Sequence, residues 1–429
     1  MMSEPCYLCP MSQAFPQIVL ATFSGKDHPG ITSELTGILA RRKTTVVDIA
    51  QAVIQNLLTL SICFEEPTED CREILQELRE HSKTLGLRFE HHLLTGDEAK
   101  AGSLPERGGH HYAVTLIADL VSAEALHLVS ATLARRGANI DMIKRLSDGG
   151  FSCVEMIISS SKDLGQDAAC ASRPKDAIRK ELLGLSKKLG VDIALQSEGL
   201  YRRAKRLVVL DMDSTLIQVE VIDELARFKG VYDDVAAITH DAMNGRIDYD
   251  ESLRRRVKML RGMTIAELER VLDHVELTPG AEELIQVLKK LGYKTALISG
   301  GFTYVAERLK NRLGIDYVYA NHLEVSDGAL TGDVIPPIVN AQRKADLLDV
   351  IAQQEKIELG QVIAIGDGAN DLLMLEKAGL GIAFNAKATV RAKADLSISQ
   401  KDLRSILYLL GLQERELSVC LGSKAQTRV

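Results

Sequence analysis

The sequence predicts an α/β protein in which two small βαββαβ units precede a doubly wound parallel sheet. One observation is an internal repeat, because residues 18–64 and 113–158 show the same succession of apolar runs and amphipathic segments. Another is that three short apolar runs after residue 205 each end in a polar cluster, which is typical of a buried parallel sheet. A chain of 429 residues suits about three domains at roughly 150 residues each.

The overall composition excludes several classes of protein. With 46% hydrophobic and 26% charged residues, the chain is neither disordered throughout nor a fibrous repeat. A net charge of −7 and the absence of tryptophan argue against nucleic acid as a partner. No apolar run approaches the roughly 20 residues that span a bilayer, and the N-terminal segment lacks the basic residues of a signal peptide. We therefore expect a soluble, cytoplasmic protein that binds neither nucleic acid nor membrane.

The seven cysteines are scattered along the chain. An odd and scattered set is typical of reduced thiols in a cytosolic protein rather than of a disulfide framework. Cys6 and Cys9 form a C-x-x-C pattern, but no second pair of ligands follows them. We interpret residues 1–17 as an N-terminal tail, and a zinc or redox role for the two thiols is the alternative.

Each copy of the repeat begins with an apolar run, 18–21 and then 113–117, which we interpret as a strand. An amphipathic helix follows in both and ends in the same tetrapeptide, Leu-Ala-Arg-Arg, at 39–42 and 133–136. Two strands, a second helix and a last strand complete the ferredoxin-like order βαββαβ. Their expected positions are 46–49, 58–62, 69–85 and 87–89 in the first unit, 18–95, and 140–142, 153–158, 174–190 and 191–194 in the second unit, 110–195.

This arrangement resembles the ACT domain, a small regulatory module that commonly binds amino acids at domain interfaces. The first unit carries Asp27-His28-Pro29-Gly30 between its first strand and helix, as that family usually does, whereas the second has Ser122-Ala123-Glu124. A glycine there lets a ligand approach the N–H groups at the helix N-terminus, which favour a carboxylate. The resemblance implies an amino-acid effector at an ACT interface between associated chains. The alternative is that both units serve only for dimerisation.

The segment after the linker at 196–205 carries the residues of a reactive site. Three apolar runs, 207–210, 295–298 and 362–365, are expected as strands, with helical patterns at 281–291, 303–313, 341–354 and 371–378. The runs lead into three polar clusters: Asp211-Met212-Asp213-Ser214-Thr215, Ser299-Gly300-Gly301 and Gly366-Asp367-Gly368-Ala369-Asn370-Asp371. Because the carboxyl ends of parallel strands meet at one crevice, we expect the three clusters to converge.

These residue types suit phosphoryl transfer. Asp211 and Asp213 lie two positions apart, so at the end of an extended strand their side chains point the same way. Asp367 and Asp371 add two carboxylates, and four acids in one crevice need a cation, for which oxygen ligands indicate Mg²⁺. A carboxylate can also attack phosphorus and form an aspartyl-phosphate. Ser299, the glycine amides and Lys344 supply the charge stabilisation that a transferring phosphoryl group needs.

Residues 205–411 resemble the haloacid-dehalogenase-like hydrolases and, within them, the phosphoserine phosphatase family. The carboxylate at Asp213 indicates a phosphatase, since dehalogenases lack one there. Further similar stretches, at 220–224, 242–245 and 252–257, lie in an insert at 218–277. The resemblance implies a Rossmann-like hydrolase core with a helical cap formed by that insert, and leaves 412–429 as a C-terminal tail.

The resemblance also implies roles for individual residues. Asp211 is expected as the nucleophile and Asp213 as the general acid and base. Mg²⁺ would be held by the Asp211 carboxylate, the Asp213 backbone carbonyl and Asp367, while Asp371 steadies the metal or Lys344. Substrate contacts are expected from both core and cap: Ser299, Gly300, Lys344 and Asn370 at the phosphate, Glu220 at the ammonium group, Arg256 at the carboxylate, and Met243 and Tyr249 as an apolar wall.

The function expected from this resemblance is Mg²⁺-dependent hydrolysis of O-phospho-L-serine to L-serine and phosphate, the last step of serine biosynthesis. We expect a homodimer with L-serine as the candidate effector at the ACT interface. Phosphothreonine, phosphohomoserine or a phosphoprotein are alternative substrates for the same chemistry. A third interpretation is an amino-acid-sensing regulator with a vestigial phosphatase domain, which the complete acidic set disfavours.

Overall fold

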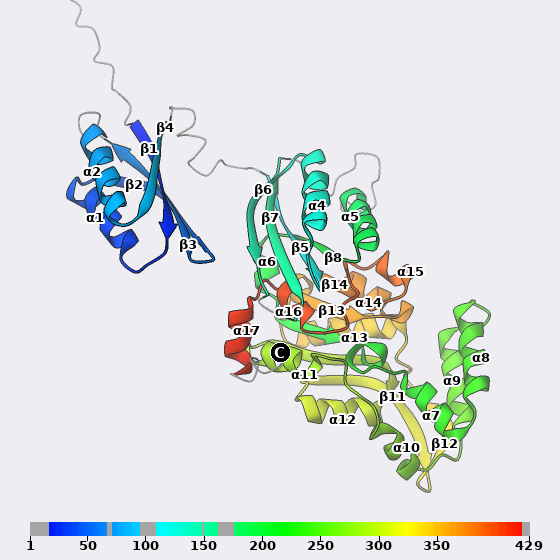
Figure 1. Cartoon of the computed structure of the whole chain (residues 1–429). Helices are drawn as coiled ribbons and strands as arrows, with labels where there is room; N and C mark the ends of the chain where they lie inside the picture. Colours follow the sequence, from blue (N-terminus) through cyan, green and yellow to red (C-terminus); the bar gives the residue numbers. More distant parts are fainter. Residues whose placement is uncertain (1–16, 67–70, 95–108, 148–149, 162–175, 423–429) are drawn as a thin grey trace, which may run out of the picture. The chain divides into compact units, whose positions relative to one another are not determined.

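A computed structural model describes residues 17–66, 71–94, 109–147, 150–161 and 176–422 of the chain (Figure 1). The chain divides into two compact units, residues 1–108 and 109–429. Cys6 and Cys9 lie outside the described residues, and of the expected tail at 1–17 only Gln17, the first residue of a strand, lies inside them. Within the described ranges, no helix combines the length and the apolar character that crossing a bilayer requires.

The first unit has the expected βαββαβ order. Its antiparallel sheet has the strand order β2-β3-β1-β4, so β2 is an edge strand. Apolar side chains of the central strands, such as Val19, form one core with Leu35 and Ile74 of the two helices. The elements are β1 (Gln17–Lys26), α1 (Ile31–Arg41), β2 (Thr45–Ile54), β3 (Leu57–Glu66), α2 (Cys71–Thr84) and β4 (Leu87–Leu94).

The second unit begins with a repetition of this plan. The sheet order is β6-β7-β5-β8, and β5 pairs with β7 in the same antiparallel manner as β1 with β3. Val114, Val129 and Ile178 place one strand and both helices in a single core. The elements are β5 (His110–Ala118), α4 (Ala123–Arg135), β6 (Ala138–Arg145), β7 (Ser152–Ser160), α5 (Asp176–Leu189) and β8 (Asp192–Ser197).

A seven-stranded sheet of order β12-β11-β10-β9-β13-β14-β15 forms the centre of the second unit. All neighbouring strands are parallel except β11 and β12, which form an antiparallel hairpin. Sequence patterns predicted the three central strands, and the structure adds four more. The strands are β9 (Leu207–Leu210), β10 (Lys294–Phe302), β11 (Tyr317–Ser326), β12 (Ala329–Ile335), β13 (Val362–Gly366), β14 (Leu380–Phe384) and β15 (Leu396–Ile398).

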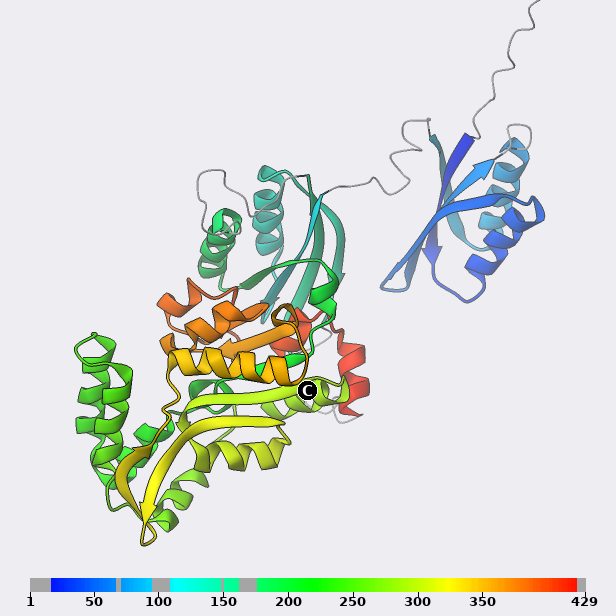
Figure 2. The same cartoon turned by 180° about the vertical axis from the view of Figure 1, so that it is seen from behind.

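Both faces of this sheet are covered, as expected for a doubly wound α/β fold (Figures 1 and 2). Successive residues of β9 point to opposite faces, so Val208 belongs to one core and Val209 to the other. One core contains α11 (Ala281–Lys290), α12 (Thr303–Leu313) and α16 (Ser405–Leu409), and the other contains α13 (Ala341–Gln354) and α14 (Leu372–Lys377). The predicted α/β fold class is therefore confirmed.

The segment between β9 and α11 is helical, as expected for a cap. It contains α7 (Val221–Lys229), α8 (Tyr232–Met243), α9 (Tyr249–Met259) and α10 (Ile265–Leu272). The β11–β12 hairpin, which the sequence patterns did not reveal, is attached to this cap. Leu330 donates its N–H to Met263 O at 2.8 Å and accepts from Gly262 N at 2.8 Å. The hairpin thus ties the cap to the sheet at a distance from the crevice.

The expected C-terminal tail at 412–429 differs from the structure. Residues Glu414–Leu421 form α17, and this helix packs against α11. Leu417 is buried, and Cys420 and Leu421 pack against the same core, so one face of the helix is apolar at helical spacing. The apolar residues of this segment recur at helical spacing in the sequence, but the segment is short and weakly apolar, so a helix was not predicted there.

The second βαββαβ domain and the parallel sheet share one compact unit because apolar and polar contacts join them. Ile117, Phe151 and Ala194 belong to one of the two cores of the sheet. Oδ2 of Asp192, at the start of β8, accepts hydrogen bonds from Ser399 N at 2.7 Å and Gln400 N at 3.1 Å. Gln196 donates to Leu409 O at 3.1 Å. In the linker, which forms α6 (Leu200–Arg203), buried Arg202 is ion-paired with Glu155 and with Glu198.

Candidate active site

The turn after β9 places the two aspartates of the first motif. Asp211 continues the strand, since its N–H donates to Ile365 O of β13 at 2.9 Å. The chain then turns tightly, with Ser214 at a φ of 56° and a hydrogen bond of 3.0 Å from Ile217 N to Met212 O. Asp213 therefore faces the cap, where its Oδ1 accepts from Val221 N at 3.1 Å, the first residue of α7.

Lys344 is the central cation of the site. It is fully buried on α13, and its Nζ lies 2.8 Å from Asp211 Oδ1 and 2.7 Å from Asp371 Oδ1. Asn340 fixes the start of α13 by accepting from Arg343 N at 3.0 Å. Burial alone lowers the pKa of Lys344, but the two adjacent carboxylates outweigh it and raise the pKa, so the side chain stays charged.

Asp213 has the electrostatic surroundings of a proton donor. Burial raises its pKa well above the usual range of an aspartate, and the nearby Glu220 and Asp211 carboxylates raise it further. Val221 N and the Lys344 charge act in the opposite direction without reversing the shift. A carboxyl group that keeps its proton near neutral pH can give that proton to a leaving group.

Three carboxylates form a cluster that could hold a metal ion. Oxygen atoms of Asp211, Asp367 and Asp371 lie within 4.8 Å of one another. Burial raises the pKa of Asp367 to about 8 and of Asp371 to about 7, and in each case neighbouring carboxylates add to the shift. Such mutually repelling oxygen donors fit a hard divalent cation such as Mg²⁺. The predicted ligand set contains the Asp213 backbone carbonyl instead of the Asp371 carboxylate. In the structure, the Asp371 carboxylate is also the partner of Lys344.

The irregular end of β10, at residues 299–301, needs glycine because it approaches both the first motif and the cap closely. A Cβ on Gly301 would lie 2.5 Å from Asp213 Oδ2, and one on Gly300 would lie 2.1 Å from the Tyr249 hydroxyl. Buried Ser299 accepts from Gly301 N at 2.8 Å. Buried Asn321 of β11 holds this end of β10 by donating to Gly300 O at 2.8 Å and accepting from Val339 N at 2.8 Å. Asn321 was not predicted from the sequence, because it belongs to no motif.

The core and cap residues surround a cavity of about 440 Å³. Arg256 of α9 and Glu220 at the start of α7 line it from the cap. Burial raises the pKa of Glu220, and Ser214 Oγ donates to its Oε1 at 2.9 Å. Among the residues expected at the site, Asp211, Asp213, Gly300, Asp367 and Asn370 line the cavity from the core, and Met243 and Tyr249 line it from the cap.

Two of the expected residues lie behind the cavity wall rather than in it. Ser299 and Lys344 are both fully buried, and Lys344 reaches the site through Asp211. Lys387, at the start of α15 (Ala388–Arg391), also lines the cavity and was not expected. It follows a strand end, as the other polar clusters do, but as a lone lysine it carries no recognisable motif.

Family models match three parts of the chain: a haloacid dehalogenase-like hydrolase model at residues 205–379, and ACT domain models at 17–92 and 110–196. The chain is 40% identical to a phosphoserine phosphatase of Streptomyces coelicolor over 94% of each chain. It is 37% identical to a phosphoserine phosphatase of Mycobacterium tuberculosis, over 93% of this chain and 94% of that one.

A solved structure shows the same fold over most of the chain. It is a HAD family hydrolase from Salmonella enterica serovar Typhi, 31% identical to this chain, with a TM-score of 0.59 over 70% of this chain and 98% of that one. The similarity to the two phosphatases is stronger evidence for the family than a shared fold alone, because it extends over all three domains together. The chain is therefore a phosphatase that belongs to the phosphoserine phosphatase family of the haloacid dehalogenase-like hydrolases, with two ACT domains ahead of its hydrolase domain.

Proposed function

We propose that this enzyme hydrolyses O-phospho-L-serine to L-serine and phosphate, the last step of serine biosynthesis. The observation that carries the proposal is the single cavity in which Asp211 and Asp213 face Glu220 and Arg256 of the cap. The first pair suits phosphoryl transfer, and the second offers one negative and one positive group for the ammonium and carboxylate of an amino acid. The names of the full-length relatives support the same substrate.

In the first half of the reaction, an Asp211 carboxylate oxygen attacks phosphorus and the bond from phosphorus to the serine oxygen breaks. Asp213 gives its proton to the departing oxygen, so L-serine leaves as the neutral alcohol and the phosphate stays as an aspartyl-phosphate. Lys344 supports this step because its charge sits 2.8 Å from Asp211 and offsets negative charge that gathers there.

In the second half, a water molecule attacks the phosphorus of the aspartyl-phosphate. Asp213, now ionised, takes a proton from that water, and the bond to the Asp211 oxygen breaks to release phosphate. Asn370 lines the cavity next to Gly368 and is suited to orient the phosphate or the water. Both acids then return to their starting protonation states.

We further propose Mg²⁺ as the cofactor, held by Asp211, Asp367 and the Asp213 carbonyl, with Asp371 beside them. The ion would supply a positive charge to the phosphate oxygens and so lower the repulsion between phosphate and attacking carboxylate. The raised pKa values of Asp367 and Asp371 support a cation here, since a positive charge would relieve the repulsion that contributes to them.

The direct test is a steady-state assay with O-phospho-L-serine, O-phosphothreonine, phosphohomoserine, a phosphopeptide and a small aryl phosphate, each with Mg²⁺ and with a chelator. We expect phosphoserine to give the highest kcat/KM and the chelator to abolish turnover. Equal or higher kcat/KM for another phosphomonoester would reassign the substrate, and full activity in the chelator would remove the metal from the proposal.

Regulation by L-serine through the first ACT domain is also part of the proposed function. Gly30 has a φ of 103° and caps α1 without a side chain, which leaves the first N–H groups of the helix open to a carboxylate. Association of two chains is supported by the edge strand β2, whose residues are exposed and include Val46, Ile49 and Ile54. We propose a homodimer in which L-serine binds at such an ACT interface.

A further inference from the structure

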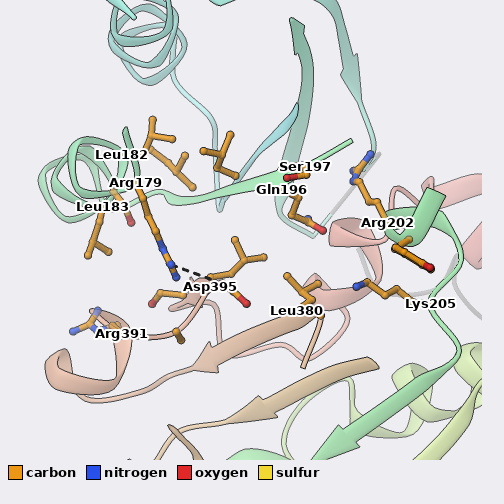
Figure 3. Close-up of a pocket in the computed structure, with 18 of the residues that line it drawn as sticks. Arg179, Leu182, Leu183, Gln196, Ser197, Arg202, Lys205, Leu380, Arg391 and Asp395 are labelled. Atoms are coloured by element: carbon orange, nitrogen blue, oxygen red, sulfur yellow. Dashed lines mark ion pairs between the residues drawn. The ribbon is translucent and has the colours of Figure 1, made fainter. Parts of the chain in front are cut away.

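A second cavity lies at the joint between the second ACT domain and the hydrolase domain, both of which belong to one compact unit (Figure 3). Its volume is about 240 Å³. Helix α5 and strand β8 of the ACT domain line one side, and the starts of β14 and β15 line the other. It is separate from the active-site cavity, because the two share no lining residue.

The wall of this joint cavity is apolar with a positive balance of charge. Leucines from both domains provide the apolar part: Leu182, Leu183, Leu195, Leu380 and Leu396. The charged lining residues are four cations, Arg179, Arg202, Lys205 and Arg391, and one acid, Asp395. Asp395 is engaged, since its Oδ1 lies 3.7 Å from Arg179 and its Oδ2 accepts from Gly381 N at 3.0 Å. Arg202 is engaged in the same way by Glu155 and Glu198, and Lys205 donates to Gly360 O at 2.6 Å. The place for an anion is therefore at Arg391.

Arg391 is the cation best placed to bind that anion. Its Nε is buried, and no described residue accepts a hydrogen bond from it. A buried donor without a partner is costly, and a charged acceptor relieves that cost. In Figure 3, Arg391 and Arg179 lie toward one end of the cavity and Arg202 and Lys205 toward the other, with Leu380 between them. An organic anion can thus meet a guanidinium and an apolar wall together.

We propose that the joint cavity is a binding site for a small organic carboxylate with an apolar body. The carboxylate is held by Arg391, and the apolar part packs against leucines from both domains. The volume of about 240 Å³ matches a ligand of the size of one ring or a branched chain. Since the ligand touches the ACT domain and the hydrolase domain at once, its binding stabilises their docked arrangement.

The place of the cavity connects it to the catalytic residues through the sheet. Lys205 lies two residues before β9, which ends next to Asp211, and Gly360 lies two residues before β13, which ends next to Asp367. The joint cavity is therefore at the amino ends of the strands whose carboxyl ends carry the site. A ligand bound in the joint cavity would therefore contact the same strands that position the nucleophile Asp211.

The test uses the full-length protein and benzoate as the probe, with binding measured by calorimetry. Benzamide, which has the same ring without the charge, and sulfate, which has charge without the ring, are the control compounds. We expect benzoate to bind and to raise Tm, and both controls to bind at least about tenfold more weakly, because loss of a charge-assisted bond costs at least about 1.4 kcal/mol. Absence of benzoate binding, or equal binding of benzamide, would overturn the proposal.

Substitutions test whether benzoate binds in the joint cavity. Arg391→Ala should weaken benzoate binding at least about tenfold, whereas Lys393→Ala, a change at an exposed neighbour outside the cavity, should not. Leu183→Trp, which fills the cavity and keeps its charges, should also weaken binding, with folding checked by urea unfolding. Arg256→Ala should leave the affinity unchanged. Loss of binding in Arg256→Ala, or retention of it in both Arg391→Ala and Leu183→Trp, would place benzoate in the active site or elsewhere and refute the joint site.

Discussion

At Asp211 the carboxylate is held in place by two contacts. Lys344 Nζ lies 2.8 Å from its Oδ1, and Met212 N donates to the same oxygen at 2.7 Å. Two residues later, Asp213 has a raised pKa because it is buried beside Glu220 and Asp211. Two aspartates in one motif thus lie in different surroundings, which suit them to different roles.

This difference predicts the effect of removing the nucleophile. Asp211→Asn keeps the shape of the side chain and removes its charge, so kcat should fall by several orders of magnitude. Rapid trapping with hydroxylamine should yield a hydroxamate from the native enzyme and none from the variant. Asp233→Asn, at an exposed acid on α8, is the matched control and should keep full activity. Substantial turnover by Asp211→Asn without deamidation would refute the assignment.

Arg256 allows a test of substrate selection. Losing a charge-assisted bond to the substrate carboxylate costs about 1.5–3 kcal/mol, so Arg256→Ala should lower kcat/KM for phosphoserine by at least about tenfold. An aryl phosphate lacks the carboxylate and should be hydrolysed as before. Arg255→Ala is the control, because Arg255 is exposed and bound to Glu251 at 2.7 Å on the same helix. Equal losses on both substrates would show that Arg256 supports the phosphate or the fold instead.

Asp367 gives a prediction for pH. Its pKa of about 8 in the metal-free protein lies above the value of about 3.9 for a free aspartate, so the folded state binds more protons between these values. Its contribution to stability is therefore full below about pH 4 and is lost as the pH rises through about 8. In a chelator, urea unfolding should show stability falling over this range, and less steeply in Asp367→Asn.

Mg²⁺ should reverse that loss, because the ion competes with the proton for Asp367. The increase in Tm caused by Mg²⁺ should be larger at about pH 9 than at about pH 6 in the native enzyme. The Asp367→Asn variant should show a small increase at both. An increase in the native enzyme that does not depend on pH would contradict the assignment of Asp367 as a ligand.

At the scale of elements, periodicity and strand-end motifs were enough to predict the central strands and the helices between them. The run 207–210 is continuously apolar because β9 is buried on both faces, and this is a strong signal. Edge elements carry a weaker signal, since β12 has several exposed residues. The Asp327-Gly328 turn that joins it to β11, with φ of 51° and 77°, is nevertheless a local hairpin signal that was not used in the prediction. Asn321 and Lys387 were missed because each is a single polar residue outside any motif.

Helix α17 offers a test of an element that the sequence did not reveal. Leu417 is only 3% exposed, so Leu417→Ala should lower the free energy of unfolding by about 2–5 kcal/mol through lost burial and a cavity. Val419 on the same helix is 81% exposed, and Val419→Ala should change the stability little. The measurement is urea unfolding of both variants. Equal effects would mean that α17 does not pack on α11 in solution.

At the scale of the whole molecule, the two ACT domains stand in different relations to the catalytic domain. The second is joined to it by Asp192 and Gln196 within one compact unit, whereas the first forms a unit of its own. The sequence repeat predicted two similar domains but gave no sign of this difference, because the joining contacts link residues about 200 positions apart. Deletion of residues 1–108 therefore keeps the described contacts between the second ACT domain and the hydrolase domain.

The last prediction uses this division to separate feedback control from product inhibition. L-serine fits the active site as a product, so some competitive inhibition is expected in any form of the enzyme. If the first ACT domain also senses serine, a coupling of about 1–3 kcal/mol would change the inhibitory potency by about 5–150-fold. Deletion of residues 1–108 should then abolish the allosteric part and leave the competitive part, as measured from serine inhibition at several phosphoserine concentrations.

A single substitution locates the effector within the deleted unit. Gly30→Val should reproduce the loss of allosteric inhibition while catalysis is retained, because a side chain at a φ of 103° strains the backbone that the ligand carboxylate would approach. Gly86→Val introduces comparable strain at a φ of 70° in the turn between α2 and β4. This turn lies beside Gly25 at the end of β1 but contributes no N–H group of the α1 N-terminus, so the variant should keep the serine response. Unchanged potency in the deletion would leave the first ACT domain with dimerisation alone, whereas equal loss in both valine variants would trace the response to the folding of that domain and not to a ligand at Gly30.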